Sequence, residues 1–339
     1  MTSLRLGIAS DGALHEPTLR FFKDCGIEAS TSNPRSYTGH IRALPGVVVH
    51  FLRGGDITNK VEEGSIDFGV VGLDRYEESR REGGDAHVII ESLGFGHCEL
   101  VLAVPDSWVD VTSVADLADL SLEFRREGRD LRVATKAPRL VERFLFRHGV
   151  GHFALVQSSG TLEAAPAMGY ADMIADISSS GLTLRENRLK TLHGGTIIKS
   201  EAVLIANRGL VVGDKAKLEK ARALVELIEG YLQSKDYFSV TANLRGETPE
   251  EVASYILSRA VIAGLRGPTI AKVHTRTGEG WYAATVVVSK EKLMDAVDNL
   301  RQIGGSGVTV GQPNYVFHGE SKAYNRLVNG TGDAQPPDA

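Results

Sequence analysis

The chain has 339 residues, and its 38 lysines and arginines against 43 aspartates and glutamates give a net charge of −5 and a pI near 6.1. This balance excludes nucleic acid or anionic membrane as a partner held by bulk charge alone. With 42% hydrophobic and 24% charged residues, and no stretch near the ~20 apolar residues of a membrane span, the composition is that of a globular protein with two or three domains.

The amino-terminal residues show no basic region followed by an apolar core, so we expect a cytoplasmic protein. Cys25 and Cys98 have no spacing typical of a disulfide framework or a metal site, and we predict two buried thiols. The Gly/Asp/Pro-rich end from about Thr331 predicts a disordered tail.

The first two-thirds of the chain alternates short apolar runs with amphipathic segments, which predicts βα units around mainly parallel sheets. The expected strands are 4–9, 47–52, 66–72, 88–90, 100–104, 131–135, 154–157, 173–177 and 202–206. The expected helices are 15–25, 138–148 and 215–233, where Pro17 or Pro138 marks a start and Gly26 or Gly149 marks an end.

Beyond the third helix the pattern changes to the order strand, helix, strand, strand, helix, strand, at residues 238–244, 249–257, 269–274, 281–288, 291–303 and 308–317. This order is typical of the ferredoxin-like split βαβ fold.

The most informative segment runs from residue 163 to residue 187. It predicts a helix, a Gly stop, a strand ending near Asp176, a serine-rich turn with Gly181, and a new helix whose first turn carries Thr183. Unpaired N–H groups and the dipole at a helix start favour an anion such as phosphate, and Asp176 is placed to accept ribose hydroxyls or help hold Mg²⁺. The alternative is that the serines of the turn only cap the helix. Asp172, about 13 Å away along an extended strand, is not expected to share an ion with Asp176.

This segment resembles the phosphoribosyl-diphosphate loop of the ATP phosphoribosyltransferase family. Other segments agree in the right order from about residue 4 to residue 317, and the last two resemble the regulatory domain of the family's long form: 44–46, 51–57, 67–74, 93–96, 264–270 and 303–308.

The resemblance implies a fold of two α/β lobes like type II periplasmic binding proteins, plus a ferredoxin-like (ACT-like) domain. The expected boundaries are 1–98 with 193–234 for the first lobe, 99–192 for the second, 235–320 for the regulatory domain and 321–339 for the tail. The implied reaction is attack of adenine N1 of ATP on C1 of phosphoribosyl diphosphate, with Mg²⁺ present and pyrophosphate released, as the first step of histidine biosynthesis. Histidine is the implied inhibitor, and a homodimer or hexamer is the implied assembly.

The resemblance also assigns residues. In the phosphoribosyl-diphosphate site it places Glu163, Asp176, Ser178, Ser179, Ser180, Gly181, Leu182 and Thr183, with Asp176 as the metal ligand. In the ATP cleft it places Ser10, Asp11, Gly12, Arg53 and Asp74. In the histidine site it places Asn243, Gly267 and Thr269, where family members carry Ser at the position of Gly267.

One active-site segment departs from the family. After the first strand the family has a Lys-Ser-Gly-Arg-like turn that meets the phosphates, whereas Ser10 and Ala13 stand in place of its two cations and Asp11 adds a carboxylate. One such electrostatic contact is worth ~3 kcal/mol. Candidate replacements are Arg35, Arg53 and Lys136. The departure leaves open a second function, that of a catalytically impaired paralogue that senses nucleotide or histidine.

Two further clusters have ordinary interpretations. Arg125, Arg126, Arg129 and Arg132 alternate with acidic residues around a polar loop, which predicts a solvated, ion-paired surface. His148 and His152 flank two glycines, so we expect a turn and no metal site.

Overall fold

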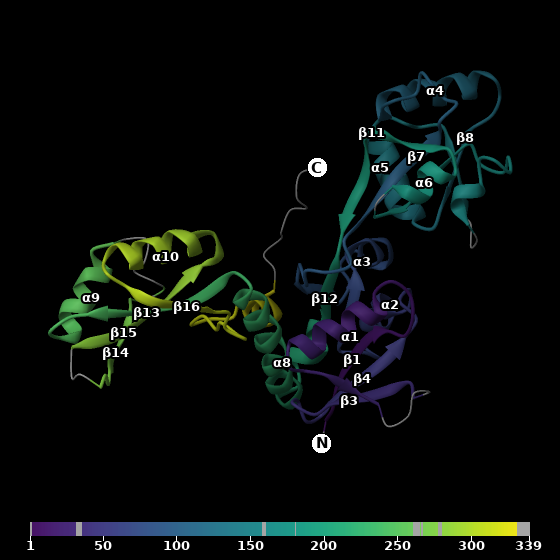
Figure 1. The fold of residues 1–339 in the computed structure, drawn as a ribbon. Coiled ribbons are helices and arrows are strands. Elements are labelled where there is room, and N and C mark those ends of the chain that lie inside the picture. The colour runs from purple at the N-terminus through teal and green to yellow at the C-terminus, as the bar shows by residue number, and fades with distance from the viewer. Residues whose placement is uncertain are drawn as a thin grey trace. The chain divides into compact units, whose positions relative to one another are not determined.

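The computed structural model describes residues 2–31, 36–157, 161–179, 181–259, 265, 267–276 and 280–330 (Figure 1). The chain divides into two compact units, Met1–Arg222 with Arg326–Ala339 and Ala223–Asn325. None of the described helices is long and apolar enough to cross a membrane.

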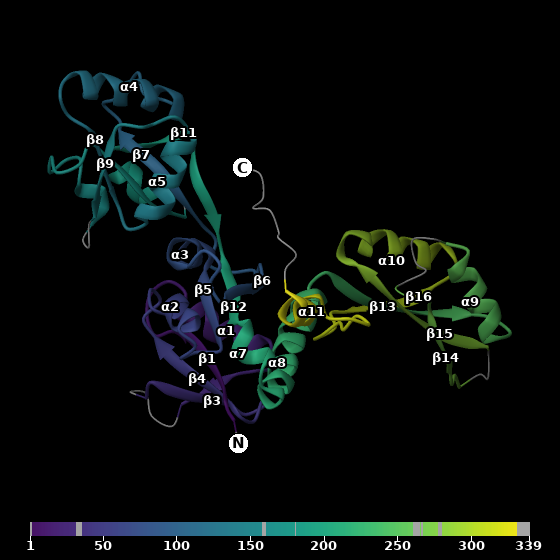
Figure 2. The same ribbon diagram turned by 180° about the vertical axis from the view of Figure 1, so that it is seen from behind.

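The first unit contains two lobes, and the first lobe is built on a seven-stranded sheet of order β2-β3-β4-β1-β5-β12-β6. Figure 2 shows β12 beside β6 at one side of this sheet. Its strands are β1 (Leu4–Ala9), β2 (Ala29–Ser30), β3 (Thr38–Ile41), β4 (Val47–Leu52), β5 (Phe68–Gly72), β6 (Ala86–Ile90) and β12 (Ala202–Asn207). Its helices are α1 (His15–Asp24), α2 (Ile57–Glu62), α3 (Leu73–Ser79), α7 (Arg208–Val212) and the start of α8 (Lys215–Ser234).

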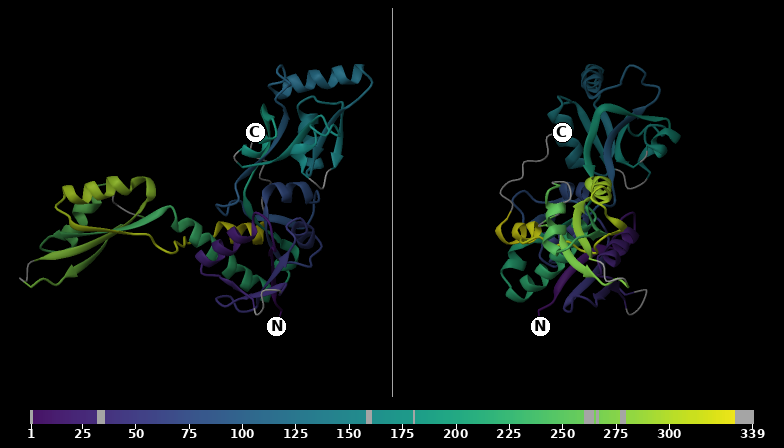
Figure 3. Two further views of the ribbon diagram at one scale, coloured as in Figure 1. Left: turned by 45° about the vertical axis from the view of Figure 1, so that its right-hand side comes forward. Right: turned by 60° about the vertical axis from the view of Figure 1, so that its left-hand side comes forward.

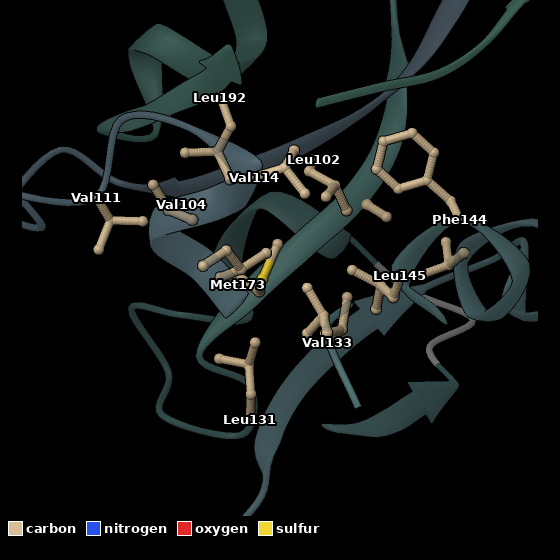
Figure 4. Close-up of a cluster of buried hydrophobic side chains, with 14 residues drawn as sticks. Leu102, Val104, Val111, Val114, Leu131, Val133, Phe144, Leu145, Met173 and Leu192 are labelled. Carbon is tan, nitrogen blue, oxygen red and sulfur yellow. The ribbon is translucent and has the colours of Figure 1, made fainter. Parts of the chain in front are cut away.

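The second lobe is built on a five-stranded sheet of order β11-β7-β10-β8-β9. Figure 4 shows its core, in which Leu102, Val133 and Met173 from the sheet pack with Phe144 and Leu145. Its strands are β7 (Cys98–Pro105), β8 (Leu131–Thr135), β9 (Phe153–Gln157), β10 (Met173–Ser178) and β11 (Leu189–Ser200). Its helices are α4 (Val114–Arg126), α5 (Pro138–Arg147), the 3₁₀ turn η1 (Leu162–Ala164) and α6 (Leu182–Glu186).

The two lobes repeat one topology. Each contains three parallel strands, of which the first in chain order lies between the second and the third, as in β4-β1-β5 and β9-β8-β10. An antiparallel strand pairs with the third of these strands, namely β12 with β5 in the first lobe and β7 with β10 in the second. In both cases the chain enters this antiparallel strand from the other lobe. This two-lobed α/β fold confirms the fold class expected from the sequence.

An arginine–aspartate pair anchors the amino end of the strands in both lobes. Arg5 on β1 binds Asp67, just before β5, through its backbone N–H (2.8 Å) and its guanidinium (2.7 Å). Arg132 on β8 binds Asp172, just before β10, through the same groups at 2.8 and 3.0 Å. Asp172 therefore joins β8 to the start of β10 through Arg132.

The chain crosses between the lobes twice, and the crossings are tied together. The first runs from Ile90 to Cys98, and the second consists of Glu201, which separates β11 from β12. The Glu201 carboxylate accepts hydrogen bonds from Ser92 Oγ (2.7 Å) and Gly94 N (3.2 Å) of the first crossing.

The second unit contains a four-stranded antiparallel sheet of order β14-β15-β13-β16. Both of its helices lie on one face of the sheet (Figure 3), as their shared hydrophobic core requires. This is the predicted ferredoxin-like fold. Its elements are β13 (Tyr237–Arg245), α9 (Pro249–Leu257), β14 (Thr269–Val273), β15 (Trp281–Ser289), the 3₁₀ turn η3 (Lys290–Lys292), α10 (Leu293–Gln302) and β16 (Ser306–Gly311).

Some segments differ from the sequence prediction. β11 continues to Ser200, beyond the boundary expected at residue 192, because it pairs with β7 as far as Cys98. The segment predicted as a tail contains α11 (Lys322–Asn329), and β16 ends six residues before Phe317. Residues 331–339, predicted to be disordered, lie outside the described residues. Cys25 is a buried thiol, as predicted, whereas Cys98 is only partly buried, so the prediction of a buried thiol is wrong there.

The arginine cluster also differs in part, since Arg125 and Arg126 lie in the last turn of α4 where a loop was expected. Its ion pairs are as predicted, with Arg125 on Asp130 and Arg129 on Glu127 and Asp172. The segment from His148 to His152 forms the expected turn, in which Gly149 has a φ of +76°.

Candidate active site

The serine-rich segment lies at the carboxyl end of β10, where it turns into α6. Ser178 Oγ accepts a hydrogen bond from Gly181 N (3.0 Å), which closes the turn. Gly181 has a φ of +70°, a left-handed conformation that favours glycine, and it precedes Leu182 at the start of α6. Ser179, Leu182 and Thr183 are exposed, and Ser180 lies outside the described residues. The turn therefore presents its backbone and hydroxyl groups to solvent.

Asp176 lies two residues before the turn, in a half-buried position. Burial raises the pKa of its carboxyl above the ordinary value, and the nearby carboxylate of Glu163 in η1 raises it further, against the hydrogen bond from Ile177 N (2.8 Å). Lys136 and Arg75 act on the same carboxyl in the opposite direction. Asp176 is thus the point where residues of both lobes meet.

The first lobe contributes Asp74, in the first turn of α3. Its carboxylate accepts a hydrogen bond from Ser200 Oγ (2.7 Å), and its backbone N–H donates to the same oxygen (3.0 Å). A small cavity between the lobes is lined by Asp74, Arg75, Glu78, Leu100, Lys136, Ala137, Ala175, Asp176 and Ile177. The structure therefore brings Asp74 and Asp176 to one cavity, as the sequence assignments require.

The other residues assigned to the first lobe lie in two neighbouring turns. Ser10 follows β1 and donates its N–H to Leu52 O (2.7 Å) at the end of β4. Gly12 has a φ of +77°, and Asp11 is exposed. Arg53 is an exposed residue directly after β4. These residues lie together at the carboxyl edge of the first sheet, but none of them lines the cavity at Asp176.

Glu78 on α3 ties the first lobe to the second. Its two carboxylate oxygens accept hydrogen bonds from Arg139 N (3.0 Å) and Leu140 N (2.9 Å), at the start of α5. The guanidinium of Arg139 donates in return to Arg80 O. Because a helix start carries unpaired N–H groups and a partial positive charge, the carboxylate of Glu78 caps α5 from the opposite lobe.

A larger cavity of about 510 Å³ adjoins the serine-rich turn. Ser178, Ser179 and Gly181 form one wall. The rest comes from β7 and β11 and includes Glu99, which accepts a hydrogen bond from Thr196 Oγ1 (3.3 Å) and lies 3.9 Å from Lys199 Nζ. The turn thus opens onto a polar space of the size that a small ligand occupies.

The residues assigned to histidine lie in the second unit. Asn243 on β13 and Thr269 on β14 lie on the sheet face that turns away from the helices, because the alternate residues face the core. β15 lies between them, and Thr269 is in register with Thr241, two residues from Asn243 along β13. The two residues are therefore roughly 12 Å apart, two strand spacings across and two residues along. Gly267 has a φ of +110°, a left-handed conformation that favours glycine over the serine that the resemblance places at this position.

Comparisons with known proteins identify the family of this chain. The family model described as ATP phosphoribosyltransferase matches residues 53–230, and the model described as the HisG C-terminal domain matches residues 234–312. The chain is 38% identical over 335 residues to "ATP phosphoribosyltransferase 2, chloroplastic" of Arabidopsis thaliana, covering 97% of this chain and 81% of that protein. This chain belongs to the ATP phosphoribosyltransferase family.

The family likeness extends to bacteria and to a solved structure. An ATP phosphoribosyltransferase of Caulobacter vibrioides is 34% identical over 329 residues, which is 96% of this chain and 97% of the relative. A chain of the ATP phosphoribosyl transferase (HisG:HisZ) complex from Thermotoga maritima has the same fold, with a TM-score of 0.51 at 23% identity over 66% of this chain and 96% of that one.

Sequence reasoning missed the residues that join the lobes of this ATP phosphoribosyltransferase-family protein. Glu78, Arg75 and Ser200 carry no local motif, and they reach the site only through the fold. Lys136, one of three candidate cations, lies beside Asp176, whereas Arg53 does not line that cavity and Arg35 lies outside the described residues.

Proposed function

We propose that this protein transfers the phosphoribosyl group of phosphoribosyl diphosphate to N1 of the adenine of ATP and releases pyrophosphate, in the first step of histidine biosynthesis. The observation that carries the proposal is the segment from Glu163 to Thr183, which combines the family motif with an exposed serine-rich turn, a half-buried Asp176 and an adjoining cavity. Family membership supports ATP and phosphoribosyl diphosphate as the substrates.

In the proposed reaction the protein holds and orients two substrates. The turn from Ser178 to Thr183 binds the 5-phosphate through backbone N–H groups and hydroxyls, and Asp176 accepts hydrogen bonds from the ribose hydroxyls. The C1–N1 bond forms as the bond from C1 to the pyrophosphate oxygen breaks, and the electron pair of that bond leaves with pyrophosphate. Most of the rate enhancement therefore comes from alignment and from positive charge placed near the leaving group.

Asp176 and Glu163 fit a Mg²⁺ ion that is shared with the substrate. Mg²⁺ in such sites is held by one or two carboxylates together with phosphate oxygens, and the carboxylate of Glu163 lies near enough to Asp176 to act on it electrostatically. Within the described residues, no group of three or more acidic, histidine or cysteine side chains forms a metal site on its own. The ion would neutralise charge on the diphosphate.

The second unit is the proposed regulatory domain. We assign histidine to the open face of its sheet, near Asn243, Gly267 and Thr269, with support from the match to the HisG C-terminal domain. Binding linkage requires that histidine and substrates weaken each other's binding if histidine inhibits. We propose a homodimer or hexamer, as the family resemblance implies, and a cytoplasmic location.

The test is an absorbance assay for phosphoribosyl-ATP with ATP, phosphoribosyl diphosphate, Mg²⁺ and pyrophosphatase, run with and without histidine. Product that is suppressed by histidine supports both the reaction and the regulatory domain. Folded protein that binds phosphoribosyl diphosphate but forms no product would contradict the proposed reaction in favour of a ligand sensor. A histidine affinity that is independent of bound substrate would contradict the proposed regulation.

A further inference from the structure

The two lobes present equivalent turns to the substrate, and the positive charge lies on the turn where the family motif does not place it. The turn after β1 carries Ser10 and Ala13 in place of cations, while the turn after β8 carries Lys136. β1 and β8 are each the central strand of a set of three parallel strands, and five strands of the two sheets share one order, β4-β1-β5-β12-β6 and β9-β8-β10-β7-β11. In parallel α/β sheets, ligands bind at the carboxyl ends of the strands. Both turns therefore lie on the substrate side of their lobes.

We propose that Lys136, assisted by Arg75, binds the pyrophosphate group of phosphoribosyl diphosphate and stabilises its charge as it leaves. The inference rests on the proposed function. The Nζ–H groups of Lys136 would donate to the phosphate oxygens that receive the electron pair of the breaking C1–O bond. No proton needs to be transferred, because the lysine acts as a fixed positive charge.

The surroundings of Lys136 support this role. Its side chain is exposed and lines the cavity between the lobes with Asp74, Arg75 and Asp176. Among the residues that the structure describes, Lys136 has no hydrogen-bond or ion-pair partner, although it acts electrostatically on Asp176. Arg75 comes from the opposite lobe and lies 3.9 Å from Asp74. The cavity itself has room for about one water molecule, at about 20 Å³. Lys136 and Arg75 are both exposed at its rim, so an anion bound there would meet a cation from each lobe.

Neighbouring positive groups are already engaged. The start of α5, next to Lys136, is capped by the carboxylate of Glu78, so its N–H groups are not available to phosphate. Lys199, in the larger cavity, lies 3.9 Å from Glu99. The cavity at Asp176 thus depends on side-chain cations, and Lys136 is the one whose charge no described carboxylate neutralises by direct contact.

The experiment measures binding separately from turnover. Phosphoribosyl diphosphate and inorganic pyrophosphate, each with Mg²⁺, are titrated calorimetrically into wild type, K136A, K136R and K23A. Lys23 is an equally exposed lysine in the last turn of α1 and serves as the matched control. We expect K136A to bind both ligands at least tenfold more weakly, K136R to stay within about threefold of wild type and K23A to be unchanged, in line with the cost of losing one charged contact. Equal affinities in K136A and wild type would overturn the inference.

A charge transplant gives a second test. In the K136A background, Ser10→Lys with Ala13→Arg restores cations to the turn after β1, and we expect it to recover most of the lost pyrophosphate affinity. No recovery would contradict the idea that the two turns serve one phosphate group. If wild type forms no phosphoribosyl-ATP yet K136A still loses pyrophosphate binding, the proposed function fails while the anion site stands.

Discussion

The two lobes of the first unit share their scaffold and differ in their chemistry. At the amino ends of the strands, each has an arginine on its first strand, paired with an aspartate that precedes its third strand. At the carboxyl ends the lobes diverge: the first has Asp74 and a turn without cations, and the second has Lys136, Asp176 and the serine-rich turn. The repeated residues therefore hold the sheets together, and the residues that differ lie on the proposed substrate side.

The anchors themselves differ in burial. The Asp67 side chain is 0% exposed and also binds Lys217 Nζ (2.6 Å), whereas the Asp172 side chain is 12% exposed and its partners Arg132 and Arg129 are more than 40% exposed. Burial alone would raise the pKa of Asp67, but hydrogen bonds from Arg5 and Lys217 outweigh it and lower the pKa. The same anchor is thus a buried charge network in one lobe and a partly solvated pair in the other.

The largest expected effect on stability comes from removing the aspartate of each arginine–aspartate pair. Asp67→Ala leaves the nearly buried Lys217 without its partner and should lower the free energy of unfolding by about 3–5 kcal/mol. Asp172→Ala leaves two arginines that reach water and should cost about 1.5–3 kcal/mol. Urea unfolding of both variants beside wild type measures the difference. Equal losses would mean that burial does not distinguish the two anchors.

Asp176→Asn tests the substrate side of the second lobe. We expect turnover to fall about 100-fold, the usual scale for one electrostatic contact with the reacting groups. Because the pKa of Asp176 is raised, the folded state binds its proton more tightly than the unfolded state, and the carboxylate destabilises the fold above its ordinary pKa. The variant should therefore be more stable than wild type at pH 7 in thermal unfolding. A variant that is less stable but fully active would contradict both assignments.

Glu78→Ala removes the cap that one lobe provides for a helix of the other. Its loss should cost about 1 kcal/mol, the value of a helix cap, and should raise the KM for phosphoribosyl diphosphate because Lys136 and Asp176 lose their fixed position opposite α3. The control is Glu77→Ala on the same helix, whose ion pair with Arg80 is worth only about 0.3–0.5 kcal/mol. Identical kinetics in the two variants would show that the interlobe cap does not position the site.

The smallest effect concerns a cap inside the second lobe. Asp116 and Ser113 form a capping box at the start of α4, and hydrogen bonds from Thr112 and Ser113 lower the pKa of Asp116 to about 2. Its stabilisation is present above the unfolded pKa of 3.8 and is lost as the pH falls towards 2. Asp116→Asn should therefore be less stable than wild type at pH 7 but equal to it at pH 2.

The fluorescence of Trp108, which contacts Phe124 of α4, can follow this transition. The control is Asp56→Asn in the first lobe, because Asp56 precedes α2 without a side-chain cap. A difference between wild type and Asp116→Asn that persists unchanged at pH 2 would contradict the pKa assignment.

The local sequence pattern correctly predicted the elements whose ends are marked by the limits of an apolar run or by a proline. β1, β4, β8 and α9 have the predicted limits, because an apolar run or a helix start at Pro249 fixes each of them. β11 escaped prediction because Gly194 and Gly195 interrupt it and it shifts register against β7 there. The last turn of α4 was predicted as a loop because it is rich in charged residues.

The site was predictable as far as it is local. Asp176 and the turn after it follow from a strand, serines and a glycine in sequence, whereas Glu78 and Arg139 are 61 residues apart and meet only after the lobes form. One long-range signal was present in the sequence. Gly64 and Asp67 have the same spacing as Gly169 and Asp172, and each glycine carbonyl accepts a hydrogen bond from the arginine of its anchor. This repeat would have aligned the two lobes, and with them the turns after β1 and β8.

The placement of β12 has a consequence for how the protein is made. β12 lies between β5 and β6, but its residues follow the whole second lobe in the chain, and β6 has no other strand neighbour in the described sheet. The second lobe, in contrast, is one continuous segment from β7 to β11. On the ribosome, the first lobe emerges earlier yet must wait, with β5 uncovered on one edge, until Asn207 has been synthesised. We therefore expect the second lobe to fold first, against the usual amino-to-carboxyl order of domain folding.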